Sequence, residues 1–250
     1  MQVRDRYRPK PEGRYLSLLL ALAGGLWLIF FPTSSANRAS AQGETPADRI
    51  AFTRDGLIYT VNPDGSGLVP VGGGGDPSWS QRGKFAFNYG PGDHTSIAVM
   101  NEDGTDLVVL TPPDLPSASQ PDFSPDGTRI LFVTDVLKTV PGEPAPIGFA
   151  RVHVMDADGG NRRPLFTGDA AETTVHEFFP AWSPDGTRVA FIGQTTANSF
   201  ELFVANSDGL SAPVQLTNLG PGQVTLSQLA WSPDGQRLAF AAQEIGRAHV

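Results

Sequence analysis

The chain has 250 residues, of which 18 are basic and 26 acidic, and its formal net charge at pH 7 is −8. An acidic surface repels phosphate backbones, so a nucleic-acid partner is not expected. The chain contains no cysteine, which excludes disulfide bonds, thiolate metal sites, a cysteine nucleophile and a cysteine-linked lipid anchor.

The first 41 residues have the layout of a secretory signal. Basic side chains precede the apolar run LSLLLALAGGLWLIFF at residues 16–31, and small residues lead to Ala41. We predict a signal peptide cleaved after Ala41 or a retained membrane anchor, with a helix over the apolar run, and then a linker over residues 42–48. The remainder is then periplasmic or extracellular and carries 12 basic against 24 acidic side chains.

Two short phrases repeat along the rest of the chain. The first is an aromatic residue, then Ser-Pro-Asp-Gly, then an apolar strand, at residues 123–132, 182–191 and 231–240, with the weaker copy WSQRGKFAF at 79–87. The second is an apolar strand that ends in x-Asp-Gly, at residues 57–65, 97–104, 152–159 and 202–209. Another short strand follows the second phrase, as at residues 107–111 and 214–217.

Both phrases have the residue chemistry of hairpin turns. Proline presets φ, serine and aspartate bond their own backbone, and glycine adopts the positive φ that closes the hairpin. We therefore interpret these residues as structural. They are Pro125, Asp126, Gly127, Pro184, Asp185, Gly186, Pro233, Asp234 and Gly235.

Four short strands per unit predict an all-β fold. Four-stranded antiparallel units repeating every 40 to 60 residues or so are typical of β-propeller blades. The glycine of the first phrase recurs at spacings of 44, 59 and 49 residues, so inserted loops account for the variation. We predict an incomplete ring of about four blades over residues 49–243.

The SPDG turn, the following strand and the x-Asp-Gly turn before a Leu-Thr strand resemble TolB-type and other WD40-like (PD40-type) bacterial propeller repeats. The resemblance covers residues 49–243. It implies protein contacts at the cell envelope, as for periplasmic TolB, or the propeller domain of a prolyl-oligopeptidase-type peptidase.

Such rings have six or seven blades, so we expect a C-terminally truncated fragment. We interpret residues 244–250, including His249, as translated sequencing adapter.

Candidate binding residues are expected on one face of the ring. In each unit the two tight turns share a face, while the second connection and the link to the next unit share the other, and the variation in length lies there. The longest insertion is residues 135–150, which could dock on a partner or be a proline-stiffened surface loop. The candidate partner-binding residues are Asp76, His94, Asp122, Glu143, Asp169, His176 and Glu177. For Asp169, His176 and Glu177 the alternative role is that of solvated rim residues. His153, inside an apolar strand, is expected in the core.

Catalytic and metal-binding motifs are absent from the sequence. There is no Gly-x-Ser-x-Gly or His-Glu-x-x-His, and the glycine run at 72–75 lacks the lysine of a P-loop. The Asp-Gly turns lack the spaced ligands of an EF-hand, so neither a metal nor a cofactor is predicted.

The sequence therefore predicts an exported, non-catalytic propeller that binds a protein or peptide partner in the bacterial cell envelope and meets the membrane only through its N-terminal segment. One alternative is the propeller portion of a prolyl-oligopeptidase-type serine peptidase whose catalytic domain is missing from this chain. The other is a polysaccharide lyase, which would need channel-facing histidine and arginine with a metal.

Overall fold

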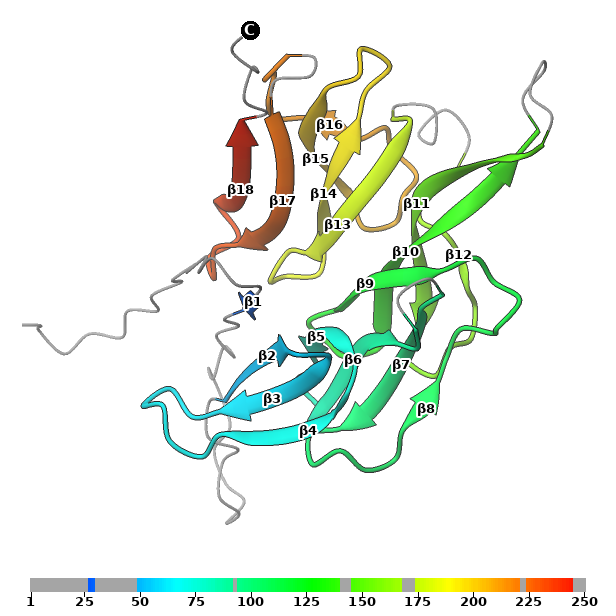
Figure 1. The fold of residues 1–250 in the computed structure, drawn as a ribbon. Helices are drawn as coiled ribbons and strands as arrows, with labels where there is room; N and C mark the ends of the chain where they lie inside the picture. Colours follow the sequence, from blue (N-terminus) through cyan, green and yellow to red (C-terminus); the bar gives the residue numbers. More distant parts are fainter. Residues whose placement is uncertain are drawn as a thin grey trace, which may run out of the picture.

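The computed structural model describes residues 27–29, 49–91, 94–139, 145–167, 174–220 and 224–244. Every regular element among them is a β-strand. The strands form four four-stranded sheets and one two-stranded sheet, in which neighbouring strands are antiparallel. Figure 1 shows the sheets following one another in chain order along an arc, from β2–β4 to the β17–β18 pair.

Each sheet is a meander whose strands pair in chain order, and we call the sheets blades 1 to 5. Blade 1 contains β1 (Trp27–Ile29), β2 (Ile50–Arg54), β3 (Leu57–Val61) and β4 (Val69–Gly73). Blade 2 contains β5 (Gly75–Trp79), β6 (Lys84–Tyr89), β7 (Ser96–Asn101) and β8 (Val108–Val109). Blade 3 contains β9 (Ala118–Phe123), β10 (Arg129–Lys138), β11 (Ile147–Asp156) and β12 (Arg163–Pro164). Blade 4 contains β13 (His176–Trp182), β14 (Arg188–Gln194), β15 (Phe200–Asn206) and β16 (Val214–Gln215), and blade 5 contains β17 (Val224–Trp231) and β18 (Leu238–Glu244). The predicted four-stranded antiparallel units are thus confirmed.

The SPDG phrase closes the first hairpin of a blade, as its residues predict. In blade 4, Gly186 has a φ of 70°. Asp185 Oδ1 accepts a hydrogen bond from Thr187 N at 3.0 Å, and Ser183 Oγ accepts one from Arg188 N at 2.9 Å. The same bonds recur in the turns that begin at Ser124 and Ser232. Local side-chain chemistry therefore fixes this corner in each copy.

Tryptophan and arginine join successive blades. The Arg129 guanidinium lies 4.5 Å from the ring centroid of Trp182, and Arg188 lies 4.6 Å from that of Trp231. Each indole also donates a hydrogen bond to a carbonyl of the preceding blade, at 3.2 and 3.1 Å. Between the blades lies an apolar core whose largest fully buried side chains are Phe85, Phe87, Phe132, Phe191 and Phe203.

The helix predicted over residues 16–31 is not present at residues 27–29, the part of this run that the structure describes. The apolar run is predicted to be helical, but Trp27–Ile29 forms strand β1, paired with β2 from Trp27↔Thr53 to Ile29↔Ala51. An edge strand has unpaired backbone groups that a further strand can satisfy, and tryptophan and isoleucine are residue types enriched in strands. The rest of residues 1–48 lies outside the described residues. Within the described part, no helix is long and apolar enough to cross a membrane.

Candidate functional site

Each blade has a turn face and a loop face, and backbone hydrogen bonds repeat on both. On the turn face, the third connection of a blade donates to the first. The bonds are Glu102 N to Gly83 O, Ala157 N to Thr128 O and Ser207 N to Thr187 O, at 3.0, 2.8 and 2.9 Å. On the loop face, residues that lead from one blade into the next bond to the second connection of the preceding blade. Gly74 N donates to Gly56 O at 3.0 Å, and Ala118 N, at the start of β9, donates to Thr95 O at 2.7 Å.

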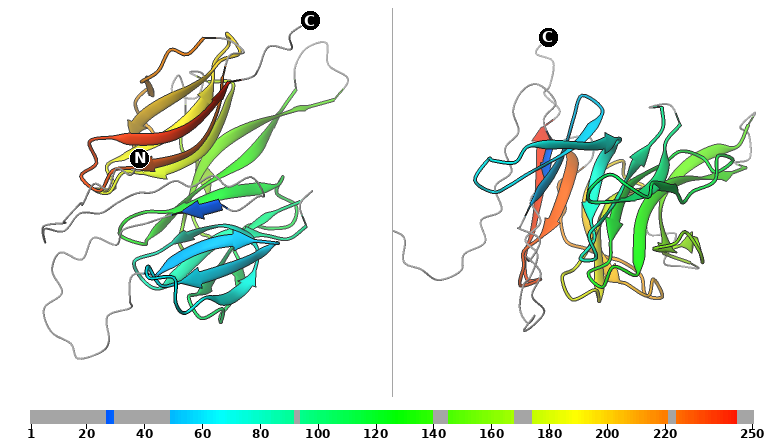
Figure 2. Two further views of the ribbon diagram at one scale, coloured as in Figure 1. Left: turned by 60° about the vertical axis from the view of Figure 1, so that its left-hand side comes forward. Right: turned by 90° about the horizontal axis from the view of Figure 1, so that it is seen from below.

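The longest insertion projects from the loop face of blade 3. A loop is predicted over residues 135–150, but β10 and β11 stay paired as far as Lys138↔Ile147. Strand β9 ends its pairing with β10 at Thr134↔Ala118, so the hairpin extends beyond its own sheet (Figure 1; Figure 2). Cross-strand side-chain pairs stabilise such a ribbon. Glu143 lies outside the described residues.

His176 lies at the base of this hairpin, on the loop face. Its ring centroid is 5.7 Å from that of Phe149 on the hairpin and 5.9 Å from that of Phe178. Its Nδ1 accepts a hydrogen bond from Ala150 N at 3.2 Å, which places the ring proton on Nε2. Burial, followed by the nearby Arg151 charge, lowers the pKa of His176. The side chain remains partly exposed, so it is accessible to a partner.

Glu177 is buried, and its predicted role in partner contact is therefore corrected. Its Oε2 accepts a hydrogen bond from Val152 N at 2.8 Å, and its Oε1 lies 3.3 Å from Arg151 Nη1. Thr174 Oγ1 donates to the same Oε1 at 3.0 Å. Burial raises the pKa of Glu177, while Val152 N–H and Arg151 oppose that shift. The carboxylate joins blades 3 and 4 and is only 1 % exposed.

Comparison of the blades explains why a glutamate occupies this position. In blade 2, Ile97 N donates to Thr111 Oγ1, and in blade 4 Leu202 N donates to Thr217 Oγ1, both at 2.9 Å. Val152 N is the equivalent group of blade 3, and it donates to Glu177 instead. The repeated sequence alone does not reveal that Glu177 replaces the threonine as acceptor, because Glu177 belongs to the next blade.

Asp122 lies near the turn-face end of β9, so its predicted place on the loop face is wrong. Its Oδ1 accepts from Ser78 Oγ of blade 2 at 3.1 Å, and its Oδ2 accepts from Trp182 N of blade 4 at 2.8 Å. Burial raises the pKa of Asp122 to about 7, while the bonds from Trp182 and Ser78 oppose that shift. A single carboxyl therefore connects three blades.

Asp76 and His94 lie on the loop face, away from His176. Asp76 is exposed, with φ 47°, and accepts a hydrogen bond from Asn88 Nδ2 at 2.8 Å. His94 N donates to Pro91 O at 2.9 Å. The structure therefore separates the predicted residues into a group at blade 2 and a group between blades 3 and 4. Asp169 lies outside the described residues.

Sequence reasoning missed a chain of hydrogen bonds that links the inner strands of blades 4 and 3 to β6 of blade 2. The inner strands β5, β9, β13 and β17 each contain a register shift. Gln120 and Phe179 have positive φ at these shifts. Phe179 N donates to Gln120 Oε1 at 2.6 Å, and Gln120 N donates to Asn88 Oδ1 at 3.0 Å. A proline follows the shifted residue in three of the four strands, a signal that could have indicated the bulges.

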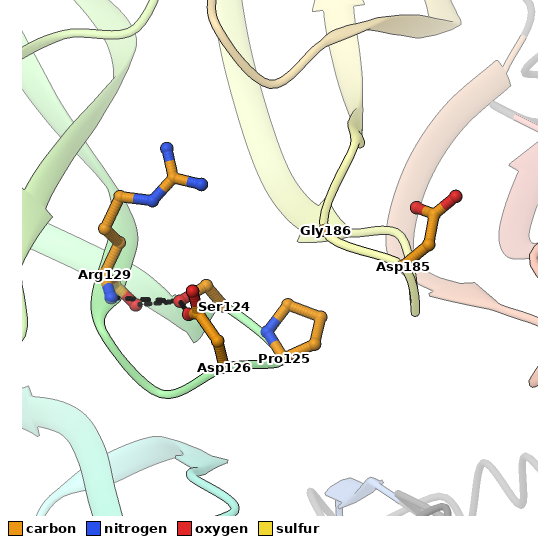
Figure 3. A pocket seen from close by; sticks show the side chains of 6 residues that line it. All are labelled: Ser124, Pro125, Asp126, Arg129, Asp185 and Gly186. Atoms are coloured by element: carbon orange, nitrogen blue, oxygen red, sulfur yellow. Dashed lines mark hydrogen bonds between the residues drawn. The ribbon is translucent and has the colours of Figure 1, made fainter.

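Two hollows lie at opposite faces. The turn-face hollow, of about 330 Å³, separates the SPDG turns of blades 3 and 4. Figure 3 shows Arg129 and Pro125 on one side of it and Gly186 on the other. Its carboxylates, Asp126 and Asp185, are bonded within their own turns, chiefly to serine hydroxyls that lower their pKa values. The loop-face hollow, of about 690 Å³, lies between blades 1 and 2.

His153 has the core position expected from the sequence. It is 8 % exposed, and its Nδ1 lies 3.2 Å from Arg151 O. Burial lowers its pKa. Over the described ranges, no three histidine, aspartate or glutamate side chains are grouped so that they could hold a metal ion.

Comparisons with known proteins identify the fold. No protein-family model matches the chain, and no curated protein matches its sequence. TolB from Acinetobacter baumannii is 15 % identical, with a TM-score of 0.58, over 76 % of this chain and 45 % of that one. The chain has a TolB-like β-propeller fold.

Other proteins of different function have similar structures. A chain of a nidogen–laminin complex is 13 % identical, with a TM-score of 0.56, over 79 % of this propeller and 71 % of that chain. A puromycin-hydrolyzing peptidase from Mycobacterium tuberculosis is 18 % identical, with a TM-score of 0.52, over 78 % of this chain and 34 % of that one. Binding proteins and enzymes thus share the fold, which does not by itself decide the activity. The chain spans less than half of the A. baumannii TolB structure.

Proposed function

We propose that this chain is an exported, non-catalytic propeller of the bacterial cell envelope that binds a protein or peptide partner on its loop face. The observation that carries the proposal is the β10–β11 hairpin, which extends beyond its own sheet. Leu137 and Ile147 on that extension are 60 % and 38 % exposed. Loops and projections on a rigid scaffold are the usual positions of binding residues.

The base of the hairpin supports a binding role because its side chains pack against one another and against blade 4. Phe149 stacks on His176, and Lys138 Nζ lies 5.7 Å from the centroid of the Phe149 ring. Below them the Glu177–Arg151 ion pair fixes β11 to blade 4. A partner that covered the hairpin would meet apolar and aromatic groups that are already ordered, which reduces the entropic cost of binding.

The envelope location rests on the N-terminal pattern and on the kind of fold. Residues 1–41 have the order of a secretory signal. The absence of cysteine requires the exported part to be held by its core alone. The TolB-like fold is consistent with such a location.

We also infer that further blades of a longer protein cover blade 5. Arg237 occupies the position of Arg129 and Arg188, each of which stacks on the tryptophan of the next blade. Arg237 and Ala239 are exposed. The same surface pattern is compatible with the alternative of a peptidase propeller. The complete coding sequence discriminates the two, because a downstream Gly-x-Ser-x-Gly would support the peptidase.

The test of partner binding is site-specific photo-crosslinking in cells. A photoreactive residue at Leu137 is compared with one at Val214, which is 62 % exposed on the outer strand of blade 4. We expect a discrete adduct from position 137 that position 214 does not give, and we expect Leu137→Asp to abolish the complex without a change in melting temperature. Equal adducts at both positions, or none at 137, would contradict the proposal.

A further inference from the structure

The loop-face hollow has the volume of a small-ligand site, is open to solvent and is separate from the hairpin. Its volume of about 690 Å³ lies within the range of about 300–1,000 Å³ typical of ligand pockets. Five glycines and Pro91 form much of its wall, and the other lining residues are Thr53, Asn88, Tyr89 and Thr95. The hollow is thus bounded by backbone and by uncharged polar side chains.

The glycine wall is fixed. Gly74 has φ 151°, and a Cβ on it would lie 2.4 Å from Phe87 Cδ2 and 2.8 Å from Asn88 O. Its N–H donates to Gly56 O at 3.0 Å. Only glycine therefore allows the link between blades 1 and 2 to lie this close to β6. A wall that is ordered before binding costs a ligand little entropy.

An unpaired hydroxyl belongs to the lining. Thr53 Oγ1 is buried and has no hydrogen-bond partner in the part of the chain that the structure describes. A buried polar group without a partner costs about 1–3 kcal/mol. Thr53 is the lining residue whose buried hydroxyl lacks a partner among the described residues, so a ligand hydroxyl that reached it would remove an existing penalty.

The lining also restricts the charge of the ligand. Among the lining residues that the structure describes, none is ionisable at neutral pH, so a charged ligand would lose water without gaining a counter-ion from them. Tyr89 is 38 % exposed and offers an aromatic ring with a polar end. Such a ring packs against the C–H face of a sugar, while hydroxyls and backbone groups bond its oxygens. We propose that this hollow binds a neutral saccharide.

Two threonines of blade 1 provide a matched test. Thr53 and Thr60 both have a buried, unpaired hydroxyl, but only Thr53 lines the hollow. Replacing either by valine removes the penalty, so Thr53→Val and Thr60→Val should both keep or raise the melting temperature. Only Thr53→Val should weaken binding of a neutral sugar, by about tenfold for one lost hydrogen bond.

The measurement is saturation-transfer NMR and calorimetry on the whole chain, with maltose and N,N′-diacetylchitobiose as neutral probes and digalacturonate as a charged probe. Gly73→Phe is a second variant that fills the hollow, because a Cβ there has only Gly56 O nearby, at 4.0 Å. We expect a neutral disaccharide to bind at millimolar concentration and Gly73→Phe to abolish binding. Absence of neutral-sugar binding, stronger binding of digalacturonate, or equal effects of the two threonine variants would overturn the proposal.

Discussion

Asp122 offers the sharpest test of how the blades are held together. Its carboxyl receives hydrogen bonds from Ser78 and Trp182, on the blades to either side. Both partners are neutral, and burial raises its pKa from 3.8 to about 7. Asp122→Asn keeps the size of the side chain and removes its charge, so the variant isolates the cost of ionising the carboxyl between the blades.

The size and sign of the effect follow from the shift in pKa. The folded protein holds this proton more tightly than the unfolded chain, so stability is greatest below the unfolded pKa and falls as the pH rises through the folded value. A shift from 3.8 to about 7 corresponds to about 4 kcal/mol. We expect the wild type to lose about that much stability relative to Asp122→Asn between about pH 4 and about pH 8.

The assay is urea denaturation of both proteins across this range of pH. The difference between the two free energies of unfolding no longer contains the contributions of the histidines and the other carboxyls, because these groups titrate in both proteins. Asp126→Asn is the control, because the Ser124 hydroxyl lowers the pKa of Asp126, so its difference from wild type should stay constant above about pH 5. A constant difference for Asp122→Asn as well would refute the reasoning.

Two further predictions concern the contacts between blades. Glu177→Gln should lower the free energy of unfolding, measured by urea denaturation, by about 3 kcal/mol, because the buried Arg151 loses its counter-charge. A decrease as small as that of an exposed ion pair, about 1 kcal/mol or less, would contradict this. Gly209→Ala should destabilise far more than Gly65→Ala. A Cβ at 209 would lie 1.8 Å from Leu165 O, whereas one at 65 meets nothing within 4 Å, so the second change costs only the backbone strain of about 1–3 kcal/mol. Equal melting temperatures for the two variants would show that the close approach is absent.

His176 and Glu177 are neighbours on β13 but differ in exposure. His176 is partly exposed, so its substitution can affect a ligand without loss of stability. Glu177 is 1 % exposed, so its substitution should reduce stability as a turn substitution such as Gly186→Val does. The two neighbouring residues have different roles because adjacent side chains of a strand point to opposite sides.

The sequence by itself determined the strands, the turns and the two faces of the blades. An SPDG corner is specified within about four residues, by proline φ, serine and aspartate bonds and glycine at positive φ. Gly127, Gly186 and Gly235, at φ 67°, 70° and 66°, are therefore readable in advance. The repetition of these corners then places the SPDG turns on one face.

Only the tertiary structure decided which predicted residues are accessible. Asp122 accepts hydrogen bonds from the Ser78 hydroxyl and the Trp182 backbone N–H of the blades on either side of it. Glu177 meets Arg151, which is 26 residues away in the chain. Residues 135–138 pair with residues 147–150 as a ribbon, although the prolines of this insertion suggest a loop. Burial and long-range pairing depend on neighbours that come together only after the blades stack, and no local pattern of residues records them.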